Sequence, residues 1–369
     1  MSGVEFDIAL FQGDGIGPEV AKPAVELMLA AAERIGGLKL HLTDLPSGAD
    51  CYVETGDALP ESSVEKARAA DAILLAAMGD PKVRYPDGTE ITPQIDLRFI
   101  LGLYAGVRPV RTIPGLPPVL ANPRAADIDF ILIRESTEGL FASMKKGEVL
   151  DDAIARETLE ITRAGTARVV DFGFRLARKR RERGFKGELA CIDKANVFRS
   201  FAFFRKVFDE RAKEFPDVAV RHGYVDAMAL DMVRRPWDYD VMVMENMFGD
   251  ILSDLGAGLM GGLGMAPSAD IGDSHAVFQP CHGTAPDIAG QGKANPTGMV
   301  LSAAMMLEWL GETHGEDRAA AAGSLLRRAV DAAFAPGDLL TVELGGSHGT
   351  AEIVSRFGRA LGEVGLHDG

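Results

Sequence analysis

Two aspartates in the segment ENMFGDILSD (245–254) are spaced so that a helix would place both carboxylates on one face. Asp250 and Asp254 are four residues apart, and a short apolar strand pattern precedes the segment. Like charges this close repel each other unless a cation joins them or water screens them. Hard divalent cations such as Mg²⁺ prefer oxygen ligands. The pair therefore indicates a metal site, although acids favoured by a helix N-terminus explain the pair equally well when it is considered alone.

A lysine follows another apolar strand pattern, ELACI (188–192). Lys194 stands just beyond this strand, and α/β proteins build their sites beyond the carboxyl ends of strands. Burial or a nearby metal could lower its pKa enough for proton transfer. The alternative is a lysine that simply reaches solvent.

Three arginines could hold an acidic substrate. Arg98 and Arg108 are ten residues apart, and Arg134 ends the strand pattern DFILIR. Guanidinium groups bind carboxylates through two parallel hydrogen bonds, so three of them could clamp a di- or tricarboxylate. Each one taken singly is more typical of a surface residue.

Two glycine-rich segments and one basic run remain. The segment GDGIGPE (13–19) lacks the G-x-G-x-x-G spacing of a Rossmann fingerprint, which favours a tight strand-to-helix turn. The loop HGTAPDIAG (282–290), followed by Asn295-Pro296, has a composition that can wrap a nucleotide. The run RKRRER (178–183) ends a helical pattern, where cations complement the helix dipole, and we favour this interpretation over a binding role.

Short apolar runs alternate with longer helical patterns along the chain. We expect strands at 6–11, 71–77, 129–134, 188–192 and 240–244, and helices at 18–34, 155–183 and 198–214. This alternation predicts an α/β fold with a largely parallel sheet covered by helices. At 369 residues, two domains are the natural expectation.

Composition excludes several classes of protein. The net charge of −15 would repel nucleic acid and anionic membranes, but not a small anion held by a few local arginines. The three cysteines show neither a disulfide framework nor zinc-site spacing, which is typical of a reducing compartment. The N-terminus reads as an acid-interrupted strand and not as a signal peptide, and no apolar run reaches the roughly 18 to 20 residues that span a bilayer. We expect a cytoplasmic protein that binds neither nucleic acid nor membrane.

Taken together, these segments resemble the isocitrate/isopropylmalate dehydrogenase family, the β-decarboxylating dehydrogenases of 3-isopropylmalate, isocitrate, homoisocitrate and tartrate or malate. The matching blocks are GDGIGPEV (13–20), LR…LYAGVRP (97–109), IRESTEGLF (133–141), DKANV (193–197), YVDAM (224–228), ENMFGDILSD (245–254), HGTAPDIAG (282–290) and KANPTGMVLSAAMMLE (293–308). Their order extends from about residue 8 to 308, and a closing helix pair is expected after it. Several long motifs in register are far more specific than any one of them.

The resemblance implies a two-domain fold that is not a Rossmann fold. Residues 1–106 and 258–369 would form a large domain with the nucleotide-binding loop. Residues 107–257 would form a smaller domain with the metal ligands and most of a homodimer interface. The active site would lie in the cleft between them, so closure around the ligand is expected.

The resemblance also implies roles for individual residues. Arg98, Arg108, Arg134 and Asn196 would bind a hydroxy-dicarboxylate substrate. Asp250 and Asp254 would bind Mg²⁺ or Mn²⁺ together with Asp226 of the partner subunit, and Lys194 of the partner subunit would assist removal of the hydroxyl proton. Such shared sites imply an obligate dimer.

The nucleotide loop resembles the NAD form of the family. The expected cofactor-binding residues are His282, Gly283, Thr284, Ala285, Asp287, Ile288 and Asn295. The carboxylate of Asp287 can accept hydrogen bonds from a ribose 2′-hydroxyl but would repel a 2′-phosphate. The NADP-selective bacterial relatives have lysine and tyrosine where this chain has Asp287 and Ile288.

Two departures from the family pattern concern the chemistry and the substrate. Phe141 stands where active members have the tyrosine that protonates the enol after decarboxylation, so oxidation would survive while the last proton transfer is slow. In the substrate loop, Thr92, Gln94 and Ile95 match neither the apolar isopropylmalate pattern nor the isocitrate pattern. An amide in an apolar pocket would lack a partner, which indicates a polar or small substituent on the malate core.

The sequence therefore predicts an NAD-dependent, metal-requiring dehydrogenase of a malate-type 2-hydroxy acid, with decarboxylation. The alternative is a non-catalytic or regulatory member of the same family that binds substrate or nucleotide without turnover. Phe141 favours this alternative, whereas the retained aspartates, lysine and arginines favour the enzyme.

Overall fold

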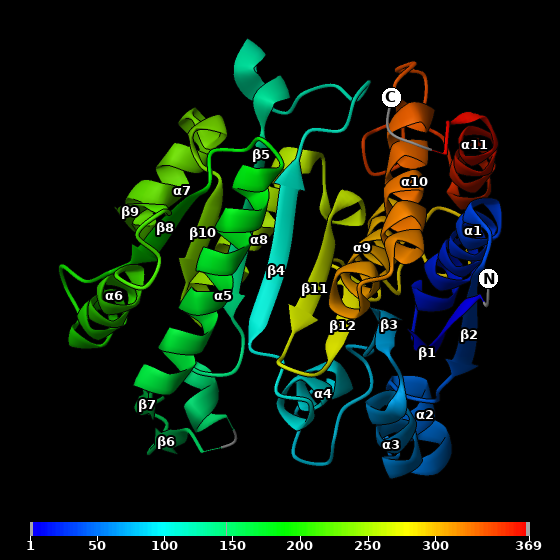
Figure 1. The fold of residues 1–369 in the computed structure, drawn as a ribbon. Helices are drawn as coiled ribbons and strands as arrows, with labels where there is room; N and C mark the ends of the chain where they lie inside the picture. Colours follow the sequence, from blue (N-terminus) through cyan, green and yellow to red (C-terminus); the bar gives the residue numbers. More distant parts are fainter. Residues whose placement is uncertain (1–2, 145, 367–369) are drawn as a thin grey trace.

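The structure, a computed structural model, describes residues 3–144 and 146–366, and a ten-stranded sheet forms its centre (Figure 1). The strands of this sheet are β1 (Val4–Gly13), β2 (Leu38–Asp44), β3 (Ala72–Ala77), β4 (Ala105–Arg111), β5 (Asp129–Glu135), β8 (Glu188–Asp193), β9 (Ala219–Tyr224), β10 (Val241–Met244), β11 (Pro267–Ile271) and β12 (Ala276–Pro280). The five strands expected from the sequence are all present, at β1, β3, β5, β8 and β10.

The sheet has two parallel blocks joined by antiparallel strands at its middle. The strand order is β2-β1-β3-β12-β11-β4-β5-β10-β8-β9. Strands β2, β1, β3 and β12 are parallel, as are β5, β10, β8 and β9, while β11 is antiparallel to both neighbours and β4 is antiparallel to β5. Because helices cover both faces, inner strands such as β3 (AILLAA) and β10 (VMVM) are buried along their whole length. The expected α/β class with a mixed, largely parallel sheet is confirmed.

Helices lie on both faces of the sheet. The α-helices are α1 (Gly17–Ile35), α2 (Ala49–Thr55), α3 (Glu61–Ala69), α4 (Pro93–Ile100), α5 (Arg163–Glu182), α6 (Arg199–Ala212), α7 (Val225–Arg234), α8 (Asn246–Met260), α9 (Thr297–His314), α10 (Asp317–Phe334) and α11 (Thr350–Glu363). Figure 1 shows α5 and α9 in front of the central strands and α8 behind them. Helices α10 and α11 confirm the expected closing helix pair. No helix within the described ranges is long and apolar enough to cross a membrane.

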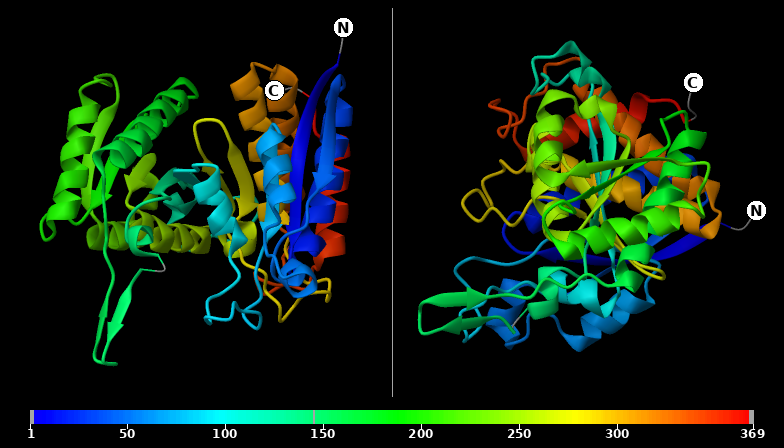
Figure 2. Two further views of the ribbon diagram at one scale, coloured as in Figure 1. Left: turned by 90° about the horizontal axis from the view of Figure 1, so that it is seen from below. Right: turned by 90° about the vertical axis from the view of Figure 1, so that its left-hand side faces the viewer.

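One expected helix begins later in the structure than the sequence pattern predicts. The pattern at 155–183 predicts a helix throughout, but residues 154–156 form β7 (Ile154–Arg156), which pairs with β6 (Glu148–Leu150) in an antiparallel hairpin. Helix α5 begins only after Thr162, whose hydroxyl accepts a hydrogen bond from the amide of Gly165 at 3.0 Å. This N-cap fixes the helix start. Figure 2 shows the hairpin projecting away from the rest of the molecule.

The first glycine-rich segment is a turn, as its spacing indicates. The Asp14 carboxylate is buried and accepts backbone hydrogen bonds from Ala49 at 2.8 Å and Gly79 at 2.6 Å. Gly15 has a φ of 60°, and a Cβ on it would lie 2.2 Å from the carbonyl oxygen of Thr284. The segment therefore joins β1 to α1 and supports the loop that follows β12.

The expected domain boundaries lie inside regular elements. Position 106 is within β4 and position 258 is within α8, and the sheet continues from one segment to the other. The largest buried core also includes residues of both segments. The division into two domains stays a prediction.

Candidate active site

A cavity of about 450 Å³ lies on the α8 side of the central strands, and it gathers ten of the expected site residues. These ten are Gln94, Ile95, Arg98, Arg108, Arg134, Phe141, Asp250, Asp254, His282 and Gly283. Four further residues, Ser253, Gln279, Pro280 and Cys281, complete the lining. The cavity has the size of small-molecule sites in general.

Three buried arginines meet around one buried aspartate at the base of this cavity. Arg98, Arg108 and Arg134 are only 6–8% exposed, and Asp270 on β11 is 2% exposed. A carboxylate oxygen of Asp270 lies 3.2 Å from Arg98 Nη2, and its other oxygen lies 3.6 Å from Arg108 Nη2. Gln279 donates to the same carboxylate at 2.8 Å. Strand pairing explains the gathering, because Gly106 of β4 lies opposite both Arg134 and Asp270.

Asp270 is the buried carboxylate of this cluster, and Arg134 also pairs with Asp250 at the cavity wall. Burial alone would raise the pKa of Asp270, but the three arginine charges outweigh it and hold the pKa below its ordinary value. Burial, together with the neighbouring charge of Arg98, lowers the pKa of Arg134 to about 10. Within the described ranges, Arg98 Nε and Arg108 Nη1 are buried without a hydrogen-bond partner. Buried donors of this kind require an acceptor, and a carboxylate is the acceptor that matches an arginine fork.

Asp250 and Asp254 form the acidic side of the cavity. The Glu245 side chain accepts hydrogen bonds from the amides at the start of α8, which fixes the helix so that both aspartates lie in its first turns. Asp250 contacts the Arg134 guanidinium. Desolvation at the cavity wall, followed by the charge of Asp250, raises the pKa of Asp254. Repulsion between two oxygen-ligand groups fits a divalent cation, although the described residues contain no group of three or more acidic, His or Cys side chains that could hold a metal within one chain.

Four expected residues lie away from the cavity in a single chain. Lys194 and Asp226 form an ion pair with each other at 2.5 Å, and a hydrogen bond from this lysine lowers the pKa of Asp226. Asn196 is exposed, and Thr92 is the N-cap residue of α4 without a side-chain cap bond. None of the four is among the cavity-lining residues of the described chain. A contribution from a partner chain stays a prediction for Lys194 and Asp226.

The expected nucleotide loop connects β12 to α9 at the edge of the same cavity. His282 has a buried Nε2 that lacks a partner among the described residues, and burial lowers its pKa, so the imidazole is neutral at pH 7. Ala285 and Asp287 are exposed on the loop, Ile288 is half-buried, and Thr284 is buried against Gly15. The unpartnered imidazole nitrogen and the exposed loop backbone suit an extended polar ligand.

The Asn295 side chain forms its hydrogen bonds within the protein. Its Oδ1 accepts from the amide and hydroxyl of Thr297, the first residue of α9, at 3.1 and 2.7 Å. Its Nδ2 donates to Glu343 at 3.2 Å. These bonds hold the end of the loop in place, so any contact of Asn295 with a nucleotide would add to an internal role.

Phe141 and Gln94 form the wall opposite the arginines. The Phe141 ring contacts Phe99 edge-on, with ring centroids 5.6 Å apart. Gln94 Oε1 is buried, and it has no hydrogen-bond partner within the described residues. One wall is therefore apolar, and next to it a buried acceptor is left for a donor on the ligand.

Several site residues escaped sequence analysis. Asp270 was missed because the short strand PSADI shows no motif, although an acid in a buried strand is itself a signal of a buried partner. Gln279 lies in the similarly short strand β12 and Cys281 follows it, and Ser253 lies inside a recognised motif without a recognised role.

Known proteins resemble this chain in sequence and in fold. The family model described as Isocitrate/isopropylmalate dehydrogenase matches residues 7–357. The 3-isopropylmalate/3-methylmalate dehydrogenase of Methanocaldococcus jannaschii is 38% identical over 357 residues, covering 96% of this chain and 99% of that protein. The 3-isopropylmalate dehydrogenase of Moorella thermoacetica is 42% identical over 325 residues, covering 86% and 88%. Among solved structures, isocitrate dehydrogenase from Methylococcus capsulatus superposes with a TM-score of 0.84 at 33% identity, covering 96% of this chain and 99% of that one.

A mixed sheet with an arginine-lined cavity beside paired aspartates defines an oxidoreductase of the dehydrogenase class. The chain belongs to the isocitrate/isopropylmalate dehydrogenase family. The resemblance noted from its motifs is confirmed, as is its assignment to the enzymes that oxidise a CH–OH group.

Proposed function

We propose that this protein oxidises a malate-type 2-hydroxy acid with NAD⁺ and a divalent metal ion, and that loss of CO₂ follows. The observation that carries the proposal is the arginine cluster, in which three buried guanidinium groups surround one buried carboxylate, while Arg98 Nε and Arg108 Nη1 have no partner among the described residues. A substrate with two carboxylates would satisfy these donors.

The aspartates would place a metal ion beside the bound hydroxy acid. Asp250 and Asp254 supply two carboxylates, and Asp226 of the partner subunit would supply the third. When bound, Mg²⁺ or Mn²⁺ would lower the pKa of the substrate hydroxyl. Lys194 of the partner subunit would assist removal of the hydroxyl proton. The isolated Lys194–Asp226 pair and the two-acid set in one chain are what an incomplete half-site would show.

The loop after β12 would bind the dinucleotide. NAD⁺ supplies the acceptor for the hydride that leaves the substrate carbon. The exposed Asp287 would accept hydrogen bonds from the ribose 2′-hydroxyl and repel a 2′-phosphate, which supports NAD⁺ over NADP⁺. His282 Nδ1 faces the carbonyl oxygen of Gly283 at 2.9 Å, so Nδ1 carries the proton, and the buried Nε2, which has no protein partner among the described residues, would accept a hydrogen bond.

The polarity of the cavity wall affects which hydroxy acid this protein would oxidise. The relatives named above act on 3-isopropylmalate or 3-methylmalate, while the solved neighbour is an isocitrate dehydrogenase. In this chain Gln94 would leave a buried oxygen unpaired beside an isopropyl group, at a cost of about 1–3 kcal/mol. A substituent that is small or carries a hydrogen-bond donor fits this wall better.

The purified chain tests the proposal directly. It is supplied with Mg²⁺ or Mn²⁺ and with NAD⁺ or NADP⁺, and malate, tartrate, isocitrate and isopropylmalate are screened for reduced nucleotide and for CO₂. We expect NADH with at least one acid. NADH without CO₂ would locate the defect at Phe141, and no reduction with any acid would favour a regulatory member of the family.

A mixing experiment tests the shared site. Asp254→Asn and Lys194→Met chains are each expected to be inactive, and they are unfolded together and refolded as a mixture. If sites form between subunits, each mixed dimer regains one intact site, and random pairing restores about a quarter of natural activity. A mixture as inactive as its parents would show that each chain builds its own site.

A further inference from the structure

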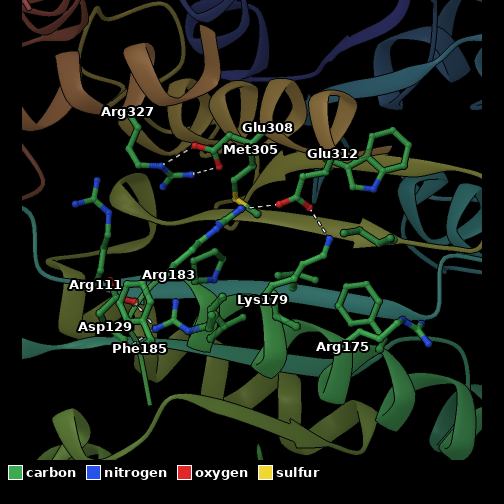
Figure 3. Close-up of a pocket in the computed structure, with 18 of the residues that line it drawn as sticks. Arg111, Asp129, Arg175, Lys179, Arg183, Phe185, Met305, Glu308, Glu312 and Arg327 are labelled. Carbon is green, nitrogen blue, oxygen red and sulfur yellow. Dashed lines mark hydrogen bonds and ion pairs between the residues drawn. The ribbon is translucent and has the colours of Figure 1, made fainter. Parts of the chain in front are cut away.

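A second cavity of about 510 Å³ lies on the other face of the sheet (Figure 3). Its floor is the apolar face of the central strands, its walls come from α5 and α9, and the aromatic side chains of Phe172 and Trp309 are among its lining. A mainly apolar interior of this size with charged groups at its walls is typical of small-molecule sites. The dehydrogenase reaction proposed above uses none of these residues.

The two cavities share a wall that is one strand layer thick. On β4, Val107 and Pro109 line the second cavity, whereas Arg108 lines the candidate active site. On β12, Phe278 faces the second cavity and Gln279 faces the first. Successive side chains of a strand point to opposite faces, so the alternation separates the two cavities completely.

Positive charge exceeds negative charge along the α5 wall. Three lining arginines have acidic partners of their own: Arg111 bonds Asp331, Arg180 bonds Asp129 and Asp240, and Arg327 bonds Glu308. The other three cations, Arg175 and Lys179 of α5 and Arg183 directly after its last residue, follow one another at intervals of four residues and therefore project on the same side.

Glu312 of α9 is the acidic residue that pairs with two of these three cations. Its carboxylate lies 2.7 Å from Lys179 Nζ and 2.6 Å from Arg183 Nη2, so it links α5 to α9, as Figure 3 shows. Among the described residues, Arg175 is exposed and forms no hydrogen bond or ion pair. Three cations and one carboxylate leave an excess of positive charge in a chain whose net charge is −15.

We propose that this cavity is a second small-molecule site, which binds an organic anion with an apolar or aromatic body and a phosphate or carboxylate head. The body would lie on the apolar strand floor beside Trp309. The head would bind Lys179 and Arg183 in place of Glu312, or together with it, and Arg175 would add an unshared charge. The basic run at the end of α5 then has a binding role beyond complementing the helix dipole.

Phenyl phosphate is a suitable probe because it combines a ring with a dianion and has no hydroxy-acid or nucleotide character. Titration of the full chain is followed by calorimetry and by Trp309 fluorescence, with Trp309→Phe identifying the signal against Trp237. We expect saturable binding without metal or nucleotide, with inorganic phosphate and phenol each about tenfold weaker, because each lacks one half of the recognition.

Charge variants separate this site from any other. Lys179→Met should weaken phenyl phosphate binding by about threefold to tenfold, and Glu312→Gln should strengthen it by about threefold, because the competing carboxylate is removed. Lys206→Met, which removes a charge from exposed α6, is the matched control and should change nothing. Circular dichroism confirms that each variant is folded.

Opposite results would overturn the proposal. Absence of saturable binding, an unchanged affinity in both Lys179→Met and Glu312→Gln, or weaker binding in Glu312→Gln would each do so. Loss of the signal in Arg98→Met with no effect of Lys179→Met would place the probe in the candidate active site instead. Because the measurement needs no turnover, its outcome is independent of the proposed dehydrogenase activity.

Discussion

The two cavities lie back to back on the same strands, yet they hold positive charge in opposite ways. In the candidate active site, Arg98, Arg108 and Arg134 are buried around Asp270, and Arg98 Nε and Arg108 Nη1 have no hydrogen-bond partner among the described residues. In the second cavity, Lys179 and Arg183 have side chains 51% and 62% exposed, and they share the carboxylate of Glu312 from a facing helix. The three arginines of the candidate active site, which lie on β4, β5 and α4, are already removed from water before a ligand binds. Lys179 and Arg183 remain in contact with water.

This difference in burial predicts how strongly each group of cations should bind an anion. A buried, preorganised cluster gives a strong and selective interaction with a small dianion, because little water remains to compete. An exposed cluster gives a weaker and salt-sensitive interaction, because water and salt screen it. Variants that remove charges from one face of the sheet at a time test this difference between the two cavities.

The largest expected effect is that of Arg108→Met. Loss of one arm of the carboxylate clamp should lower kcat/KM for the hydroxy acid by about 10²-fold, since each charge-assisted hydrogen bond contributes about 1.5–3 kcal/mol. The control is Arg111→Met, on the same strand but facing the second cavity, which should change kcat/KM by less than about threefold. Equal losses in the two variants, measured by NADH absorbance, would contradict the assignment of faces.

Asp270→Asn should destabilise the fold by about 3 kcal/mol, because it leaves buried arginine charge without its counter-ion. The arginines lower the pKa of Asp270, so its carboxylate stabilises the protein above its ordinary pKa of 3.8, and this contribution is lost as the pH falls further through the lowered value. Urea unfolding at several pH values measures it. The natural chain should lose stability more steeply below about pH 4 than the Asn variant, and parallel curves would argue against the ion pairs.

Phe141→Tyr should raise turnover of a decarboxylating substrate at least about tenfold, because it restores a phenolic proton at the cavity wall. Formation of NADH and release of CO₂ are measured separately, and only the second should respond strongly. Phe99→Tyr introduces a phenol into the partner ring of the same edge contact and is the matched control. An unchanged or slower CO₂ release in Phe141→Tyr would count against the proposed role of this position.

The smallest effect should come from Glu312→Gln. Its ion pairs with Lys179 and Arg183 are partly exposed, so the free energy of unfolding should change by less than about 1 kcal/mol. Thermal unfolding at low and at high salt checks this expectation. A loss as large as that of Asp270→Asn would show that the two faces do not differ in the way described above.

Much of the site could be predicted from the sequence because its residues stand in motifs. Asp250 and Asp254 share a helix face by spacing alone, and Arg134 ends a strand pattern. The absent Rossmann spacing rightly indicated a turn at Asp14. These features depend on local periodicity, which a sequence displays directly.

Other features depend on strand order, which a sequence does not display. Asp270 faces the arginines only because β11 pairs with β4 in the antiparallel direction. The strands β11 and β12 are too short for a periodicity, and the exposed edge strand β9 (AVRHGY) lacks an apolar pattern. The ion pair between Lys194 and Asp226 likewise arises from β8 and α7 meeting in space. The second cavity was missed for the same reason, since α5 and α9 are far apart in the chain.

The position of β3 in the sheet also bears on how the protein is made. Its six buried residues, AILLAA, pair with β1 on one side and with β12 on the other, and β12 is synthesised about 200 residues later. Until then a ribosome-bound chain would present an apolar strand with an unpaired edge, the kind of surface that recruits other chains. Nascent copies should therefore depend on chaperones or dilution until residue 280 has emerged.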